Sequence, residues 1–318
     1  MQVKSSAYKI NNNNRENKEL KETIICISGP TASGKTALSI ELAHRLNGEI
    51  VSCDSMQIYR GMDIGTAKPT AEERALAVHH MIDICSPNDN YSCADYVRDA
   101  SQAVSDIIKR GKMPIICGGT GLYLESLIYE STLSVNTTDD SVKASLMLRS
   151  PEENYRMLCE VDPESAASIH PNNVKRVIRA LEIYIVSGRT KSSLDSEYGR
   201  EKKYNSHVYV LGFADRARLY ERIDKRVDIM ISLGLVDEVK SLGLSRDTTA
   251  GQAIGYKEIM DYLDGDASLD EAIYLIKKGS RNYAKRQITW WGRNNDVGYI
   301  DMTDLSVSSA TERIIGSL

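Results

Sequence analysis

Residues 29–36 read Gly-Pro-Thr-Ala-Ser-Gly-Lys-Thr, a full match to the phosphate-loop pattern G-x-x-x-x-G-K-[ST]. The apolar run 23–28 stands directly before this octapeptide, and the helix-compatible segment 37–43 follows it. The pattern binds phosphate where a strand enters it and a helix leaves it, so a chance glycine-rich turn is the weaker interpretation here. The sequence from 23 to 43 therefore predicts a strand, a phosphate-binding loop and a helix, in this order.

The residue types of this loop suit an anion. Gly29 and Gly34 let the backbone curl so that successive N–H groups point inward, and the helix N-terminus adds partial positive charge. Lys35 supplies a mobile cation, and the Thr36 hydroxyl can bind a phosphate oxygen or its Mg²⁺. The loop thus predicts a phosphorylated ligand, whose identity must come from elsewhere in the chain.

The order of apolar segments predicts an α/β fold. Strands are expected at 49–53, 79–84, 113–117, 207–213 and 297–301, a loop-rich segment at 55–78, and helices at 92–110 and 122–129. Strands that alternate with helices form mostly parallel sheets. We therefore expect a P-loop NTPase-like core formed by residues 23–130 and 205–302. A helical insertion domain is expected at 131–204, further helices between 215 and 292, and a C-terminal helix within 303–318.

The composition of the chain limits the cellular compartment and the kinds of partner that can be expected. Among the 318 residues no apolar stretch approaches the ~20 needed to cross a bilayer, so no membrane is expected. The polar segment 1–22 lacks the apolar core of a signal peptide and is expected to be a disordered leader. The six cysteines include no Cys-x-x-Cys pair, which favours reduced cysteines, a cytoplasmic protein and no metal cluster. A net charge of −4 counts against a generally basic nucleic-acid binder.

Two further strand ends carry polar groups. Asp54 follows the second strand, and Thr120 follows Gly118 and Gly119 after the strand 113–117. Ligands of open parallel sheets bind beyond the carboxyl ends of the strands, although a lone Asp there can also simply cap a turn. A nucleotide hydrolase of this class uses an Asp at a second strand end to help hold Mg²⁺. The strand 113–117 lacks one, so the loop is expected to hold a diphosphate without cutting it.

An arginine is expected to point inward from the helix 216–233. At about 100° per residue, Arg226 shares the buried side of this helix and Arg222 lies at its edge. The buried side is defined by Leu219, Ile223, Val227 and Met230. An inward arginine needs an anionic partner, either a structural carboxylate or a ligand phosphate, and the sequence leaves both open.

Two helices carry basic faces opposite their apolar stripes. The stripe of 173–187 is Val174, Val177, Ile178, Leu181 and Ile185, and its basic residues are Lys175, Arg176 and Arg179. The stripe of 270–291 is Ile273, Ile276, Ala284, Ile288 and Trp291, with Lys278, Arg281, Lys285 and Arg286 outward and Tyr274, Asn282 and Trp290 interleaved. These faces contain almost no acid. Cations beside aromatic rings suit RNA, but a solvated surface remains an equal alternative.

Taken together, these segments resemble the bacterial tRNA dimethylallyltransferases. The resemblance rests on the phosphate loop, Ser-Cys-Asp-Ser-Met-Gln-Ile-Tyr at 52–59 and Met-Asp-Ile-Gly-Thr-Ala-Lys-Pro at 62–69. It also rests on Gly-Gly-Thr-Gly-Leu-Tyr at 118–123, Arg-Ala-Leu-Glu at 179–182, Ile-Gly-Tyr-Lys-Glu at 254–258 and Lys-Arg-Gln-Ile-Thr-Trp at 285–290. It covers about residues 23 to 293, with these strings in the family's order.

The resemblance implies transfer of a dimethylallyl group from dimethylallyl diphosphate to N6 of an adenosine. That adenosine lies just 3′ of the anticodon in tRNAs that read codons beginning with U. The resemblance makes Asp54 the general base and has Lys35, Arg226 and Thr36, the last with Mg²⁺, stabilise the leaving diphosphate. The diphosphate would be bound by Gly29, Pro30, Thr31, Ala32, Ser33, Gly34, Lys35 and Thr36.

The resemblance also implies a partner, the tRNA anticodon stem-loop. We further expect the protein to be a monomer. The implied tRNA contacts are Asp54, Ser55, Met56, Gln57, Thr120, Lys143, Lys175, Arg176, Arg179, Gln252, Gly255, Tyr256, Lys257, Lys285, Arg286, Gln287 and Trp290. Lys143 and Lys257 stand where the family often has arginine, and lysine lacks its bidentate fork. The rival interpretations are a small-molecule kinase that uses ATP and a non-catalytic RNA-binding module.

Overall fold

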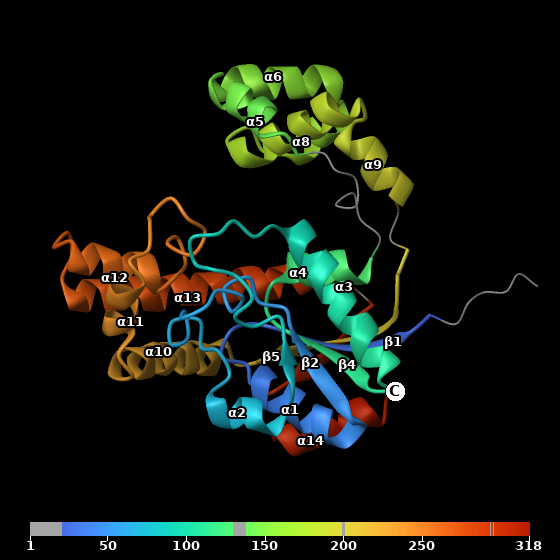
Figure 1. Ribbon diagram of the computed structural model, residues 1–318, viewed down its shortest axis with the longest axis vertical. Coiled ribbons are helices and arrows are strands. Elements are labelled where there is room, and N and C mark those ends of the chain that lie inside the picture. Colours follow the sequence, from blue (N-terminus) through green and yellow to red (C-terminus); the bar gives the residue numbers. More distant parts are fainter. Residues whose placement is uncertain (1–20, 130–137, 199–200, 293, 295) are drawn as a thin grey trace, which may run out of the picture.

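The computed structural model describes residues 21–129, 138–198, 201–292, 294 and 296–318. Its described strands form one parallel six-stranded sheet of order β3-β2-β4-β1-β5-β6 (Figure 1). The strands are β1 Thr23–Ser28, β2 Gly48–Ser52, β3 His79–His80, β4 Met113–Cys117, β5 Asn205–Gly212 and β6 Gly298–Asp301. The parallel sheet is confirmed, whereas all but the last two residues of the expected leader 1–22 lie outside the described part.

Helices cover both faces of the sheet. In β1, Ile24 and Cys26 pack into the cluster shared with α3 and α4, whereas Ile25 and Ile27 pack into the cluster shared with α1 and α14. These helices are α1 Lys35–Leu46, α3 Cys93–Lys109, α4 Gly121–Ile128 and α14 Val307–Ile315. Because both faces of the strand are buried, its sequence is continuously apolar rather than alternating.

The segment between β2 and α3 differs most from expectation. A short helix, α2 Ala71–Leu76, interrupts the stretch expected to be loop, and Thr70 and Glu73 close a capping box at its start. None of its residues is buried, so it has no apolar stripe that a sequence pattern could reveal. The strand expected at 79–84 is reduced to His79–His80 because Met81 and Asp83 adopt φ of +62° and +58°, which ends the extended backbone.

The described elements of secondary structure between residues 138 and 198, within the expected insertion, are all helices. They are α5 Asp140–Met147, α6 Pro151–Val161, α7 Pro163–Ser168, α8 Val174–Ser187 and α9 Lys191–Tyr198, and they stand apart from the sheet in Figure 1. Their own core includes Leu146, Leu158 and Leu181. Residues 131–137 of the expected insertion lie outside the described part. The expectation that Ile185 is buried is wrong, because the small bundle covers a narrow face of α8 and leaves this side chain 42% exposed.

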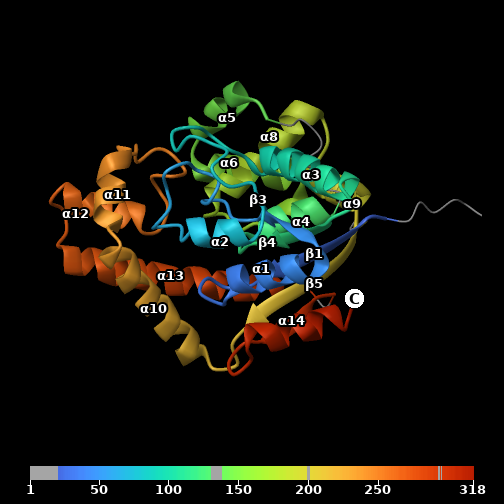
Figure 2. The ribbon, with the colours of Figure 1, turned by 60° about the horizontal axis from the view of Figure 1, so that its bottom comes forward.

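A second group of helices lies at the side of the sheet. It comprises α10 Arg216–Ser232, α11 Leu235–Leu242, α12 Tyr256–Leu263 and α13 Leu269–Trp291. Figures 1 and 2 show α13 extending from α12 to α4, which it contacts. Its last residue, Trp291, is buried in the cluster formed with α3 and α4. Among the described residues, no helix combines the length and the apolar character that a membrane crossing would require.

Candidate active site

The phosphate loop joins β1 to α1 in the geometry of an anion site. Gly34, at φ +94°, is the N-cap of α1, and no side chain caps the first N–H groups of that helix. The first turn also contains no acidic residue. Free N–H groups and the helix dipole therefore point toward the space above the loop, where a diphosphate fits.

Lys35 carries the loop's charge. Its Nζ donates to the carbonyl oxygens of Gly29 at 3.0 Å and Pro30 at 2.7 Å, and burial lowers its pKa to about 8. The ion pairs among the described residues do not include Lys35. This lysine is therefore held against its own loop by neutral partners only, which an anionic ligand can replace.

A cavity of about 1360 Å³ opens above the loop, at the carboxyl ends of the strands. Lys35, Thr36, Asp54 and Arg226, the four residues expected to be catalytic, all line it. One Asp54 carboxylate oxygen accepts the backbone N–H of Met56 at 2.9 Å, so this Asp does cap its turn while it also faces the cavity. The two interpretations of this residue are compatible.

Arg226 enters the cavity from α10. Its Nη1 lies 3.3 Å from the Thr31 hydroxyl and its Nη2 lies 3.5 Å from the Ala67 carbonyl oxygen. Burial lowers the pKa of Arg226, and the negative charge of Asp54 partly opposes this shift. Within the described part of the chain no carboxylate lies within ion-pair distance of Arg226, so the structural-carboxylate alternative finds no support. A ligand anion is the partner that this side chain lacks.

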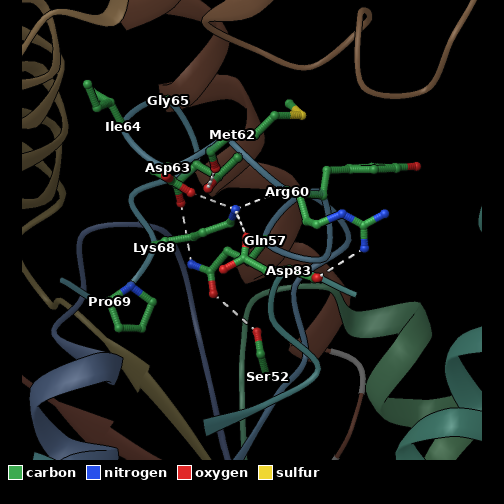
Figure 3. Close-up of polar contacts among 12 residues, drawn as sticks. Ser52, Gln57, Arg60, Met62, Asp63, Ile64, Gly65, Lys68, Pro69 and Asp83 are labelled. Carbon is green, nitrogen blue, oxygen red and sulfur yellow. Dashed lines mark hydrogen bonds and ion pairs between the residues drawn. The ribbon is translucent and has the colours of Figure 1, made fainter. Parts of the chain in front are cut away.

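The residues around Asp54 are held from two sides. Thr120 accepts the backbone N–H of Ser55 at 3.1 Å through its hydroxyl oxygen. The Gln57 carboxamide accepts from the Ser52 hydroxyl at 3.1 Å (Figure 3). It also donates to the carbonyl oxygens of Thr66 and Ala67, at 3.4 and 3.3 Å. The side chain of Gln57 therefore links β2 to the opposite wall of the cavity.

A buried lysine holds that wall from behind. Lys68 is 7% exposed, and its Nζ donates to the Tyr59 carbonyl oxygen at 2.5 Å and to the carboxylates of Asp63 at 2.8 Å and Asp83 at 2.5 Å (Figure 3). Arg74 binds the other oxygen of Asp83 at 2.9 Å. Burial alone would raise the pKa of Asp83, but these two cations outweigh it and lower the pKa.

Glu238 of α11 fixes the start of the same wall. Its carboxylate accepts the backbone N–H groups of Asp63, Ile64 and Gly65 at 3.0, 2.7 and 3.1 Å, and the Tyr256 hydroxyl at 2.6 Å. Tyr256 is 0% exposed. The resemblance implied a tRNA contact for Tyr256; in the structure this side chain is enclosed in the core and anchors the cavity wall.

The other implied contacts on this side are accessible to different degrees. Gly255, the N-cap of α12, is buried; Lys257 is half-buried and lies 3.7 Å from a Glu258 carboxylate oxygen. Gln252 is exposed and donates to the Arg246 carbonyl oxygen at 2.6 Å. Gln252 and Gly255 both line the cavity. This loop therefore presents polar groups at the cavity margin.

The two basic helices differ in how free their cations are. Lys143, Lys175 and Arg176 are exposed on the insertion, but Arg179 pairs with the buried carboxylate of Glu182 at 2.7 Å. On α13, Lys285 and Arg286 are exposed and lie over tyrosine rings, those of Tyr220 and Tyr283. Arg281 instead pairs with Asp224 at 2.5 Å, an acid that the neighbouring helix α10 supplies. Lys175 and Arg286 both line the cavity.

Two residues that the resemblance placed at the tRNA lie largely inside the protein. Gln287 is 5% exposed, with its carboxamide bonded to Thr31 and Gly119. Trp290 is partly buried against α4, where a Cβ at Gly121 would lie 2.5 Å from the indole ring. The polar atoms of the Gln287 side chain are bonded within the protein, although this residue also lines the cavity.

Sequence reasoning missed Tyr283. This half-buried residue of α13 lines the cavity, and burial, together with the negative charge of Asp54, raises its pKa to about 12. Its signal was the helical spacing, because Tyr283, Gln287 and Trp290 recur at intervals of four and three and so share one side of the helix. An aromatic ring beside the carboxylate suits a nucleobase.

The cavity also offers oxygen donors for a metal ion. The Thr36 hydroxyl and the Asp54 carboxylate both line it, which fits an Mg²⁺ ion that takes one or two protein oxygens and completes its shell with phosphate and water. Among the described residues, no three His, Cys, Asp or Glu side chains gather as a metal cluster. All six cysteines are free.

Comparison with known proteins gives one family. The family model described as IPP transferase matches residues 57–295. A tRNA dimethylallyltransferase of Anoxybacillus flavithermus is 50% identical over 89% of this chain and 91% of its own length. That of Bacillus subtilis is 48% identical over 89% and 92%, respectively.

Solved structures agree with this assignment. The tRNA isopentenylpyrophosphate transferase of Bacillus halodurans is 44% identical, with a TM-score of 0.70 over 93% of this chain and 96% of its own. A eukaryotic dimethylallyltransferase, whose crystallographic study describes it as acting on tRNA, is 31% identical, with a TM-score of 0.84 over 92% and 78%.

Proposed function

The chain belongs to the IPP transferase family, and we propose that it is a tRNA dimethylallyltransferase that releases diphosphate. The dimethylallyl group moves from dimethylallyl diphosphate to N6 of the adenosine 3′-adjacent to the anticodon, in tRNAs that read codons beginning with U. One observation carries the proposal. The phosphate loop and the Asp54 carboxylate face the same cavity, so a diphosphate donor and an amine acceptor can meet there.

The bond changes need one base and one stabilised leaving group. The lone pair of N6 attacks the allylic carbon, and the carbon–oxygen bond breaks, with its electron pair leaving on the diphosphate. The exocyclic amine is a weak nucleophile, so its proton must be removed as the bond forms. The Asp54 carboxylate lines the cavity directly after β2, and it takes that proton.

Stabilisation of the departing diphosphate comes from cations that line the same cavity. Lys35 exchanges its carbonyl partners for phosphate oxygens, and Arg226 adds a guanidinium from α10. Fixed, half-buried cations act more strongly on developing negative charge than cations in free solution do. When bound, Mg²⁺ would be held by the Thr36 hydroxyl together with the diphosphate and would neutralise part of its charge.

The tRNA anticodon stem-loop binds where cations rim the cavity. Lys175 of the inserted helical domain and Arg286 of α13 both line it, and Lys143, Arg176 and Lys285 extend the basic surface. Unstacked loop bases can be turned out of an anticodon loop at modest cost, and Tyr283 offers a ring for the base. The proposal includes a monomeric enzyme that works in the cytoplasm without a membrane.

The test is product analysis. Purified protein, unmodified tRNA and labelled dimethylallyl diphosphate with Mg²⁺ should give N6-(dimethylallyl)adenosine, identified by mass and located beside the anticodon. Asp54→Asn should lower the rate by about 10²-fold at nearly unchanged tRNA affinity. Asp247→Asn makes the same change at an exposed position on the cavity margin and should leave the rate near wild type.

Two outcomes would contradict the proposal. Absence of a prenylated nucleoside with every tRNA tested would exclude the activity. RNA-independent turnover of ATP with a small-molecule acceptor would favour the kinase alternative instead. Full turnover in Asp54→Asn would remove only this residue from the role of base.

A further inference from the structure

Gln287 occupies an unusual place in α13. Among the fully buried residues of this helix, which also include Ala272, Ile276, Ala284 and Trp291, it is the polar one. A buried carboxamide is costly unless its oxygen and nitrogen both find partners. The partners of Gln287 therefore indicate what its presence in the core achieves.

Both ends of the carboxamide bind backbone, in two different loops. Its Oε1 accepts the N–H of Thr31 at 2.9 Å, and its Nε2 donates to the carbonyl oxygen of Gly119 at 3.0 Å. A Cβ at position 119 would lie 2.1 Å from this Nε2, so only glycine allows the contact. One side chain thus joins the phosphate loop to the loop after β4.

These two loops serve the two substrates. Thr31 lies within the phosphate loop, and its hydroxyl receives the Arg226 guanidinium at 3.3 Å. Gly119 directly precedes Thr120, whose hydroxyl holds the backbone N–H of Ser55 beside Asp54. The bonds of Gln287 therefore run to the donor side and to the acceptor side of the cavity.

The same turn of α13 carries the free cations. Lys285 and Arg286 are exposed, and Tyr283 lies one turn before Gln287 at the cavity wall. A helix is rigid over a single turn, so a shift of these cations moves the carboxamide with them. RNA that binds Lys285 and Arg286 on the outer face of this turn therefore shifts Gln287 on the inner face of the same turn, and with it the two loops to which Gln287 bonds.

On the basis of the proposed function, we propose that Gln287 is a positioning residue that fixes the donor loop and the acceptor loop against α13 and couples tRNA binding there to diphosphate binding. Gln287 lines the cavity, and its carboxamide is bonded to backbone groups of both loops. Because such coupling is reciprocal, RNA tightens the binding of diphosphate by the factor by which diphosphate tightens the binding of RNA.

Binding measured by calorimetry tests the coupling. The donor-side probe is Mg²⁺ pyrophosphate, and the RNA is a synthetic anticodon stem-loop that the wild-type protein prenylates. In the wild type, RNA should tighten pyrophosphate binding by roughly 5- to 150-fold, the usual range of coupling between sites. Gln287→Leu removes both hydrogen bonds. Gln287→Glu keeps an oxygen that can accept the Thr31 N–H but loses the N–H that donates to the Gly119 carbonyl oxygen. Each should bring the factor close to one, with RNA affinity in the absence of pyrophosphate nearly unchanged.

Thr289→Ala is the matched control. Thr289 is exposed on the same helix, and its hydroxyl bonds only to the Lys285 carbonyl oxygen of its own turn. Its coupling should equal that of the wild type. The two Gln287 variants should also lose about 10²-fold in kcat, as displaced reacting groups do. Coupling that survives in folded Gln287→Leu overturns the proposal.

A measurement on the wild type keeps the proposal testable if the variants do not fold. Binding of the stem-loop without pyrophosphate should slow hydrogen–deuterium exchange in segment 29–34, because α13 holds the Thr31 amide more firmly. Unchanged exchange in this segment, in a protein that prenylates the same RNA, overturns the coupling. A protein that neither binds nor prenylates the RNA instead refutes the proposed function.

Discussion

The Nη1 atom of Arg226 lies 3.3 Å from the hydroxyl oxygen of Thr31, so helix α10 reaches the phosphate loop from across the cavity. No protein carboxylate among the described residues pairs with this guanidinium, and it is held over the loop by a hydroxyl and a carbonyl oxygen. Such weak neutral partners leave its charge available to a diphosphate that leaves from carbon.

Replacing this charge should therefore reduce the rate of the chemical step. Arg226→Gln should lower kcat by about 10²- to 10³-fold, the usual effect of removing one group that stabilises transition-state charge. Arg226→Lys keeps the charge but loses the planar fork, and its rate should fall between those of Arg226→Gln and the wild type. Single-turnover prenylation measures this. Arg218→Gln, which alters an exposed guanidinium of the same helix paired with Asp304 away from the cavity, serves as control and should change kcat far less. A normal single-turnover rate in Arg226→Gln would exclude the assigned role.

The pKa of Lys35, lowered to about 8 by burial, predicts how donor binding depends on pH. A bound diphosphate favours the charged lysine and raises its pKa, so binding above pH 8 takes up a proton. The phosphates of the donor are already ionised above pH 7, so the affinity for the donor should change little between about pH 7 and 8. Above pH 8 the affinity should fall by up to tenfold per pH unit, because free Lys35 loses its proton.

Titration of the donor diphosphate in buffers of different ionisation enthalpy checks this uptake. Lys35→Met should bind the diphosphate more weakly at neutral pH and should lose the dependence above pH 8. If the variant shows the same decline with pH as the wild type, another group is responsible for it.

The sheet was predictable because its strands are short, apolar and separated by helices. Ile24 to Ile27 are all buried, two toward each face, and this gives the continuous apolar run that indicates a parallel sheet. The loop 29–36 was predictable for a different reason, since its backbone geometry requires particular residues at fixed spacing. In both cases the local sequence is sufficient.

The interior placement of Tyr256, Gln287 and Trp290 was not predictable in this way. Their burial depends on partners far away in the chain: Tyr256 bonds to Glu238, and Gln287 bonds to Thr31 and Gly119. The sequence motifs that contain these residues indicate that they lie near the tRNA site, but the motifs do not indicate which side chains are exposed to the tRNA. Arg179 shows the same limit, because its buried acid, Glu182, lies one helical turn away on a face that the periodic pattern treats as apolar.

The wall of the cavity depends on Lys68 for stability. Lys68→Met would leave Asp83 with Arg74 as its remaining cationic partner and would remove the bond to the Tyr59 carbonyl oxygen. Removing one partner of a buried ion pair costs about 3–5 kcal/mol. Because the side chains of Asp83 and Asp63 are 31% and 61% exposed, we expect a smaller loss, about 1–3 kcal/mol, in the free energy of unfolding. Urea denaturation measures it.

Arg45→Met is the control for this loss. It breaks an exposed pair with Glu312 and should cost at most about 1 kcal/mol. The lowered pKa of Asp83 also predicts how the free energy of unfolding depends on pH. The stabilisation by this carboxylate is present above its pKa in the unfolded chain and is lost as the pH falls through its pKa in the folded protein. Lys68→Met should therefore lose less stability than the wild type on acidification. Equal unfolding energies for Lys68→Met and the wild type would show that the network does not hold the wall.

The free cations of α13 predict a particular salt dependence of tRNA binding. Lys285 and Arg286 are exposed and form no ion pair among the described residues, whereas Arg281 on the same helix is neutralised by Asp224. Each phosphate that a cation neutralises contributes about 0.7 to 0.9 to the slope of log K against log salt. The double variant Lys285→Gln, Arg286→Gln should therefore bind the anticodon stem-loop more weakly, with a slope smaller by about 1.5 because two phosphates are no longer neutralised.

A matched double variant separates local phosphate binding from net charge. Arg45→Gln with Lys109→Gln also removes two positive charges. These residues lie in the last turns of α1 and α3, at the end of the sheet opposite the carboxyl ends of the strands. Long-range attraction falls off within about 10 Å at 0.1 M salt, so this control should keep the wild-type slope. If both double variants lower the slope equally, the tRNA responds to overall charge. If only the α13 variant does, the phosphates lie on the turn that carries Gln287.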